Sequence, residues 1–160
     1  MALKSDRSTL DVDISFFMNE AATRGGVVSI STGGSGAAMD QGEALVTYAA
    51  LPSGKVPVGL LLNDMVDIDL TRQHLNQHKD EVQKGGKVTV LTRGWVLTDM
   101  IETSIDPAAG EIAYVSASEA GDLTNVAPGS SGSLAVGRFM SQKDADGYAK
   151  VYINLPGIVA

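Results

Sequence analysis

The sequence predicts an all-β protein, either a small β-barrel or a β-sandwich with long loops and an extended N-terminal arm. Three observations predict this class. Short segments alternate apolar and polar residues with the two-residue period of a strand. Turn-forming residues separate these segments at the spacing typical of sandwiches and barrels. The chain of 160 residues also contains 18 glycines, which suits a fold with many tight turns.

The first of these segments lies near the N-terminus. In residues 10–17 four apolar side chains alternate with Asp11, Asp13 and Ser15; they are Leu10, Val12, Ile14 and Phe16. Residues 1–9 are polar, so we expect them to be flexible, and residues 17–24 form either one helical turn or a loop. We assign residues 1–24 to an N-terminal arm. Its strand either pairs with the protein's own sheet or adds to the sheet edge of a neighbouring subunit. In the second case the four apolar residues bind a partner.

Residues 25–160 are expected to form a single β-rich domain, because neither a linker nor an internal repeat divides them. A break is expected at Arg93-Gly94, and a turn at residues 144–147. The expected strands cover residues 27–31, 44–50, 56–62, 87–92, 95–101, 111–116, 133–140 and 148–155.

The segment 63–86 interrupts this pattern as a long loop insertion rich in charges and amides. It is either an irregular excursion, which we favour, or it contains a short helix over residues 71–83. Long loops inside small domains are usually functional or disordered. We therefore expect this segment to contact a partner, with His74, Asn76 and His78 among the contacting residues.

The composition excludes several classes of function. The formal net charge is −7, which disfavours binding to nucleic acid or to anionic lipid. The absence of cysteine excludes disulfides and thiolate chemistry. The first residues lack the apolar core of a signal peptide, and no apolar run is long enough to span a membrane. We expect an acidic protein with neither a nucleic-acid nor a membrane partner.

No motif in the sequence carries a complete set of catalytic or ligand-binding residues. His74 and His78 have the spacing of a helical metal pair, but no convincing third ligand accompanies them. Asp144 and Asp146 begin like a calcium loop, yet an Asp-Gly hairpin turn explains them better. The glycine-rich stretches 33–36 and 129–133 match neither a nucleotide-binding loop nor a nucleophile elbow. We therefore expect no catalytic, cofactor-binding or metal-binding residues, no cofactor and no enzyme activity.

Three segments, taken in order, resemble a known family. They are residues 79–96, with the run Lys-Gly-Gly-Lys-Val-Thr-Val before Arg93-Gly94-Trp95-Val96; residues 110–123; and residues 136–155. Their order is similar to that of the capsid decoration, or cement, proteins of tailed bacteriophages. The stretch Phe16-Phe17-Met18-Asn19-Glu20 also resembles phage structural proteins.

This resemblance implies a structural protein that binds the outside of a phage head, bridges neighbouring major capsid protein subunits and stabilises the shell. The implied partners are the major capsid protein and further copies of the chain, as a trimer before a dimer. The implied location is the outer capsid surface of the virion, after synthesis in the host cytoplasm. Two alternatives remain: another virion component, such as a tail or adaptor protein, and a carbohydrate-binding surface module.

Overall fold

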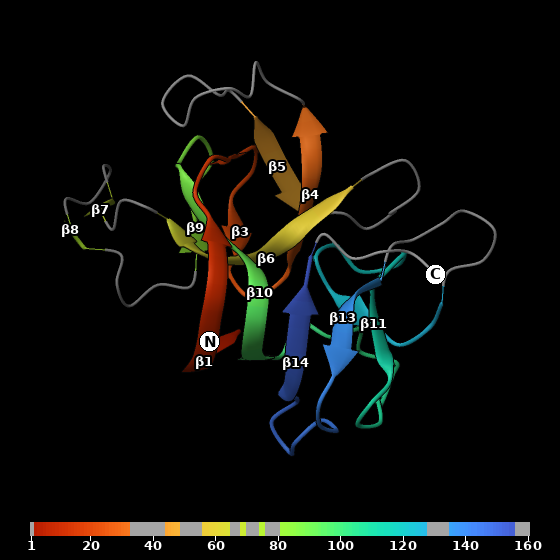
Figure 1. Ribbon diagram of the computed structural model, residues 1–160. Coiled ribbons are helices and arrows are strands. Elements are labelled where there is room, and N and C mark those ends of the chain that lie inside the picture. Colours follow the sequence, from red (N-terminus) through yellow and green to blue (C-terminus); the bar gives the residue numbers. More distant parts are fainter. Residues whose placement is uncertain are drawn as a thin grey trace.

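The computed structural model describes residues 2–32, 44–48, 56–64, 68–69, 74–75, 81–127 and 135–155 (Figure 1). Every regular element in these ranges is a β-strand, which confirms the all-β prediction. In particular, they contain no helix of the length and hydrophobicity that a membrane crossing requires. The strands are β1 (Leu3–Asp13), β2 (Phe17–Met18), β3 (Ala22–Thr23), β4 (Val27–Thr32), β5 (Leu45–Tyr48), β6 (Pro57–Asp64), β7 (Ile68–Asp69), β8 (His74–Leu75), β9 (Glu81–Val82), β10 (Val88–Thr98), β11 (Ile112–Val115), β12 (Leu123–Thr124), β13 (Ala135–Phe139) and β14 (Ala149–Asn154).

Ten of these strands form one large sheet. Nine of them follow each other in the order β12-β11-β13-β14-β10-β6-β4-β5-β2, and the tenth, β1, pairs with β10. All pairings in it are antiparallel except that of β2 with β5. Two small pairs, β3-β9 and β7-β8, lie outside it. Within the described residues no strand pairing joins β12 to β2, so the sheet does not close on itself. Of the two expected architectures, this arrangement fits a sandwich better than a closed barrel.

One layer of the sandwich contains β4, β5 and β6, the other contains β11, β13 and β14, and strand β10 joins the two. Along one edge it pairs with β1 over nearly its whole length. Along the other edge its first part, residues 88–91, pairs with β6 and its second part, residues 93–98, pairs with β14. The predicted break at Arg93-Gly94 is wrong, because the strand continues through both residues. Gly94 has φ +147, which few other residues adopt, and it allows the strand to pass without ending.

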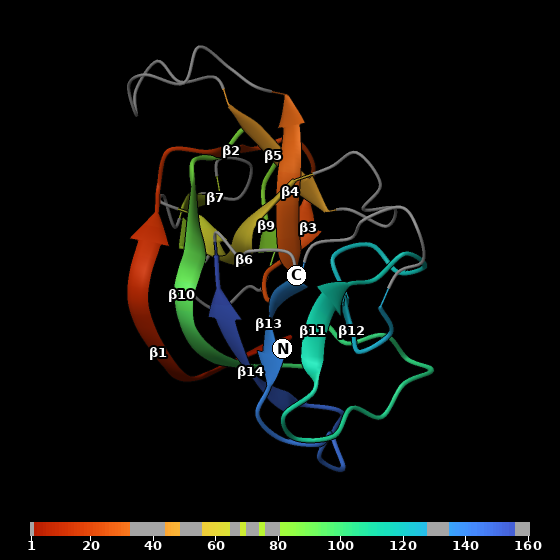
Figure 2. The same ribbon diagram turned by 45° about the vertical axis from the view of Figure 1, so that its right-hand side comes forward.

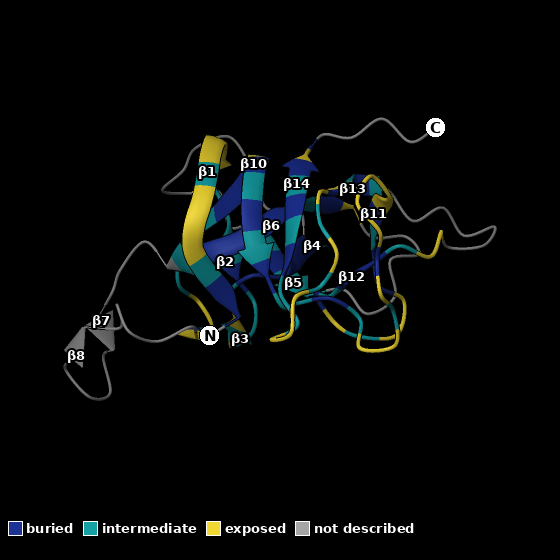
Figure 3. Ribbon diagram, turned by 90° about the horizontal axis from the view of Figure 1, so that it is seen from below, coloured by how far each residue is buried: buried dark blue, intermediate teal, exposed yellow. Residues whose placement is uncertain are grey.

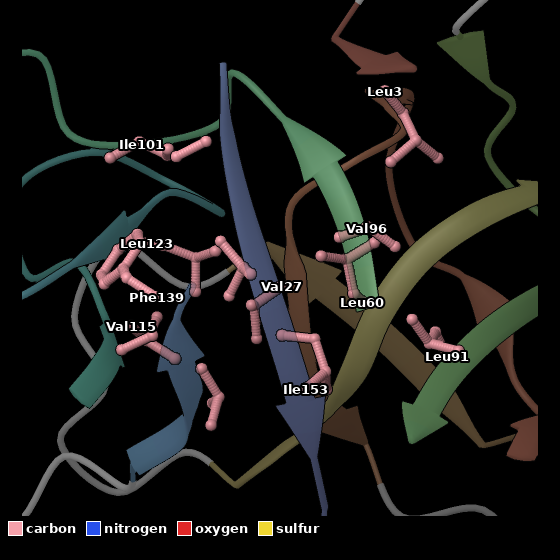
Figure 4. Close-up of a cluster of buried hydrophobic side chains, with 14 of the residues drawn as sticks. Leu3, Val27, Leu60, Leu91, Val96, Ile101, Val115, Leu123, Phe139 and Ile153 are labelled. Atoms are coloured by element: carbon pink, nitrogen blue, oxygen red, sulfur yellow. The ribbon is translucent and has the colours of Figure 1, made fainter. Parts of the chain in front are cut away.

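The core lies between the two layers (Figure 4). It collects side chains from β4 and β6 on one side and from β10, β11, β13 and β14 on the other. The largest fully buried side chain is that of Phe139. A second, smaller cluster covers the opposite face of the β4–β6 layer and includes Met18, Val46 and Val82.

The layer formed by β4 and β6 is therefore buried on both faces. Val27 and Leu60 belong to the first cluster, whereas Val28 and Leu61 belong to the second. This burial explains the uninterrupted apolar sequence of β6, since a strand covered on both faces has no solvent side to alternate with. The Val27 N–H also donates to the carbonyl oxygen of Gly121 at 2.8 Å, which fastens β4 to the loop before β12.

The N-terminal region differs from the prediction in two places. Residues 3–9 were expected to be flexible, but they form the first part of β1. Leu3 is fully buried, and the carbonyl oxygen of Ala2 accepts a hydrogen bond from the N–H of Asp99 at 3.0 Å. Residues 17–24 contain the two short strands β2 and β3 instead of a helical turn.

The segment 63–86 is described only in part. Its described residues include β7, β8 and β9, so residues 74–75 and 81–82 are extended and not helical. Val82 is buried in the second cluster, and β9 pairs with β3. The excursion therefore returns to the body of the protein at residues 81–82.

Candidate functional site

Strand β1 is the most exposed part of the sheet (Figure 3). After the buried Leu3, almost every side chain from Ser5 to Val12 is exposed. Leu10 and Val12 are 59% and 49% exposed, among the largest values for apolar side chains in the described residues. Because an exposed apolar pair on a sheet edge costs solubility unless a partner covers it, β1 is the first candidate for a contact surface.

The four apolar residues predicted to bind a partner do not share one exposed face. Leu10 and Val12 are exposed, but Ile14 and Phe16 are half-buried, and Phe16 packs against the second core cluster. The separation arises because β1 ends at Asp13. The carboxylate of Asp13 accepts hydrogen bonds from the N–H of Ser15 at 2.7 Å and from its hydroxyl at 2.5 Å, and these bonds hold the chain in a turn.

Charged side chains hold β1 in place at both of its ends. The Lys4 ammonium group lies 3.4 Å from the Asp144 carboxylate and 4.1 Å from the centre of the Tyr148 ring. The Arg93 guanidinium group lies 3.2 Å from the Asp11 carboxylate. Between these contacts, burial and the neighbouring charge of Arg24 lower the pKa of Arg7.

The three predicted contact residues of the 63–86 segment are only partly located. His74 begins β8 and stands opposite Asp69 of β7. Asn76 and His78 lie outside the described residues. Among the described residues, no three histidine, aspartate or glutamate side chains are grouped as ligands of a metal ion.

Three further exposed apolar residues, which the sequence did not single out, each follow Glu111 or a residue that is hydrogen-bonded to it. They are Ile112, Val126 and Met140, which are 40%, 59% and 50% exposed. Ile112 follows Glu111 in the chain. Val126 follows Asn125, whose side-chain amide donates to the Glu111 carboxylate at 2.7 Å. Met140 follows Phe139, whose N–H donates to the carbonyl oxygen of Glu111 at 2.8 Å.

We call this group the Glu111 end. It lies on the side of the molecule opposite β1 (Figures 1 and 2). In the sequence, residues 112–115 are four apolar residues in succession, and such a run does not reveal which of its members faces solvent.

A carboxylate cluster lies beside the β11–β12 connection. Burial opposes ionisation of Glu102, but hydrogen bonds from Ser118, Thr124, Ser104 and Ser116 outweigh it and lower its pKa. Asp122 behaves in the opposite way. Its half-buried position, its hydrogen bond to Glu119 and the nearby carboxylates raise the pKa of Asp122 to about 7. These contacts fix the connection in place and provide one group that titrates near neutrality.

The turn between β13 and β14 confirms the hairpin interpretation of residues 144–147. The Asp144 carboxylate accepts the N–H groups of Asp146 and Tyr148 at 3.0 and 2.8 Å, and Gly147 has φ +89. The hydrogen bond from Tyr148 is the main reason that the pKa of Asp144 is lowered. Its oxygens therefore close the turn, as in an Asp-Gly hairpin.

Comparison with known proteins identifies the family. A family model described as structural cement protein (E217 gp24/Pam3 gp6) matches residues 9–154, which include the last part of β1 and all the described strands after it. The chain belongs to this phage structural cement protein family. No curated protein matches the chain.

One solved structure supports the fold of this cement protein. It is a chain of the capsid of Myoviridae phage XM1, with a TM-score of 0.54 and 13% sequence identity. The match covers 97% of the cement protein and 92% of the XM1 chain. At this identity the comparison shows a shared fold. The family match itself confirms the resemblance to phage decoration proteins noted in the sequence.

Proposed function

We propose that the cement protein binds the outer surface of a phage head, where it bridges neighbouring major capsid protein subunits and stabilises the shell. The family match over residues 9–154 carries this proposal, because it covers almost all of the folded chain. In this proposal the protein is made in the host cytoplasm and joins the head there. Contacts of modest strength, repeated around a symmetric shell, provide high total affinity.

A bridging protein needs at least two separate contact surfaces, and the structure offers them on opposite sides. One is β1, with Leu10 and Val12 exposed and Ile14 and Phe16 continuing the segment into the core. The other is the Glu111 end. We assign one capsid contact to the Glu111 end and another to the 63–86 segment, which includes His74, Asn76 and His78.

We also infer that the protein has no enzyme activity and needs no metal or cofactor. Its family is described as structural. The sequence has no cysteine and only two histidines, and none of its motifs combines a nucleophile with a base in the pattern of a known catalytic site.

A binding assay with preformed, expanded phage heads that lack the cement protein tests this function. Purified protein should sediment with the heads and raise the temperature at which they release DNA. A variant with residues 65–80 replaced by a short Gly/Ser link should keep its fold, because Val82 and β9 remain to anchor the segment, but bind heads more weakly.

The Glu111 end is tested separately by Val126→Asp, with Ala21→Asp as the control. Both residues are exposed, but Ala21 precedes β3, away from the Glu111 end. We expect only the first change to weaken head binding. Failure of the unmodified protein to bind any expanded head would contradict the proposed function.

A further inference from the structure

The outer edge of β1 is a long and accessible strand edge. The strand has 11 residues, about twice the usual length, and within the described part of the chain its only strand partner is β10. Side chains on both of its faces are exposed between Ser5 and Val12. Such an edge can extend a sheet into another protein chain through backbone hydrogen bonds.

The centre of β1 is its regular part. Arg7, Ser8 and Thr9 pair without interruption with Val96, Trp95 and Gly94. Register shifts lie on either side of this stretch, between Leu3 and Arg7 and between Thr9 and Val12. Because bulges disturb strand pairing, an added strand will align best when it is centred on Arg7–Thr9.

The charges on β1 select what can pair with this edge. Its first half carries Lys4, Asp6 and Arg7, and therefore has a net charge of +1. Its second half carries only Asp11 and Asp13, with a net charge of −2. A parallel copy would place halves of like charge side by side, whereas an antiparallel copy places each cationic half against an anionic half. Opposite charges across a strand pair stabilise it, and like charges destabilise it.

We propose that β1 pairs antiparallel with β1 of a second copy of this chain, about a two-fold axis at Thr9. In this arrangement Leu10 and Val12 of one copy lie beside the first half of β1 in the other. There the aliphatic part of the Lys4 side chain can cover them. The contact of Lys4 with Asp144 and that of Arg93 with Asp11 hold the edge in place before pairing.

Two-fold pairing of one edge with itself is closed, because each edge has a single partner. The contact therefore produces a dimer, whereas the sequence led us to expect a trimer before a dimer. The inference rests on the proposed function in one respect: a two-fold pair leaves two copies of the Glu111 end free to contact two capsid subunits.

Cysteine cross-linking tests the geometry cleanly, since the chain has no cysteine of its own. Thr9→Cys lies next to the proposed axis, so two copies should form a disulfide-linked dimer on mild oxidation. Ala109→Cys, which is also exposed, is the matched control and should remain uncross-linked.

The strand direction is tested by cysteines placed away from the axis. With the axis at Thr9, Asp6 of one copy lies opposite Val12 of the other, and the two copies of Asp6 are about 20 Å apart, from the rise of about 3.3 Å per residue. Asp6→Cys alone should therefore not cross-link, but an equimolar mixture of Asp6→Cys and Val12→Cys should. Cross-linking of Asp6→Cys with itself would show parallel pairing and overturn the proposal.

Charge variants test the recognition. Light scattering should show a dimer for the unmodified protein, and R7D should weaken the dimer at least about tenfold, because it opposes two anionic halves. Mixing R7D with D11K should recover part of the loss as a mixed dimer. Circular dichroism of each variant checks that it is folded.

Three outcomes would overturn the proposal: an unmodified protein that is monomeric at high concentration, a trimeric mass, or a dimer that R7D leaves unchanged. Cross-linking of Thr9→Cys to the major capsid protein in decorated heads, without self-cross-linking, would assign the edge to the capsid and overturn it equally. Head binding is measured separately in each case. A monomer that still binds heads would refute the pairing of β1 and leave the proposed function intact.

Discussion

The close approach of β1 to β10 at Gly94 allows a quantitative test of the fold. A Cβ atom at Gly94 would lie 2.1 Å from the backbone carbonyl oxygen of Ser8 and 3.2 Å from a methyl carbon of Leu91. The first distance is more than an ångström shorter than an ordinary contact, and a backbone oxygen cannot move aside alone. In the variant Gly94→Ala, the centre of β1 must therefore move away from β10.

The expected cost has two parts. A residue other than glycine at φ +147 costs about 1–3 kcal/mol. Displacing β1 adds about 1–3 kcal/mol, which is typical of forcing extra atoms into a packed region. The total corresponds to a fall of roughly 10 °C in Tm, at about 2–4 °C per kcal/mol for a chain of this size.

The matched control is Gly110→Ala. Gly110 also has a positive φ, +97, but no atom lies within 4 Å of the position that a Cβ atom would occupy there. This variant carries only the conformational cost of about 1–3 kcal/mol, and its Tm should fall by about 6 °C. Differential scanning calorimetry gives both values, and hydrogen exchange should show faster exchange in β1 for Gly94→Ala alone. Equal Tm values for the two variants would refute the close packing of β1 against β10.

Three further predictions concern the buried start of β1, the carboxylate cluster and the histidines. Leu3→Ala should lower the free energy of unfolding by about 2–5 kcal/mol because Leu3 is fully buried. Leu10→Ala should change it by less than about 0.5 kcal/mol because Leu10 is exposed. Urea titration measures both values, and equal effects would contradict the start of β1 at Leu3. The pKa of Asp122 is raised to about 7, above its value of 3.8 in an unfolded chain, so the stability from its protonated form is complete below pH 4 and is lost as the pH rises through 7. Asp122→Asn should therefore raise the free energy of unfolding at pH 8 by about 1–2 kcal/mol, after allowance for the partial exposure of Asp122, and so raise Tm there. At pH 4 it should have little effect on Tm. An equal shift of Tm at both pH values would contradict this reasoning. EDTA should leave Tm unchanged, and a rise of several degrees with stoichiometric zinc would show that the histidines bind metal after all.

Local patterns in the sequence predicted much of the β-sheet. Residues 149–155 alternate strictly, and β14 buries Ala149, Val151 and Ile153 as expected. The start of β1 was missed because Leu3 follows only Ala2 among the apolar residues there, and this start is fixed by residues far along the chain: Leu3 pairs with Thr98, and Ala2 accepts a hydrogen bond from Asp99. The continuity of β10 was missed because Gly94 looks like a turn residue. Its actual role, to let β1 approach, depends on a neighbour that the local sequence does not specify.

The contact surface remains a prediction, but the structure shows where its predicted residues lie. Leu10 and Val12 are exposed, as a partner-binding role requires. Ile14 and Phe16 fit the same alternating pattern, but the turn that Asp13 stabilises directs Phe16 into the second cluster. Alternation shows which residues share a face of one straight strand, and it cannot show where the strand ends. The Glu111 end was not predicted, because its three members come from separate segments that only the fold brings together.

The division of β10 between two partners has a mechanical consequence. A force along β1 is transmitted through its ladder to β10, and from there to β14 and β6 together. Because β1 and β10 run antiparallel over a long stretch, such a force shears many backbone hydrogen bonds at the same time. A force directed away from the sheet would instead break them one after another, starting at an end of the strand. The protein should therefore resist extension along β1 far better than peeling of β1 away from β10, and single-molecule pulling along these two directions would measure the difference.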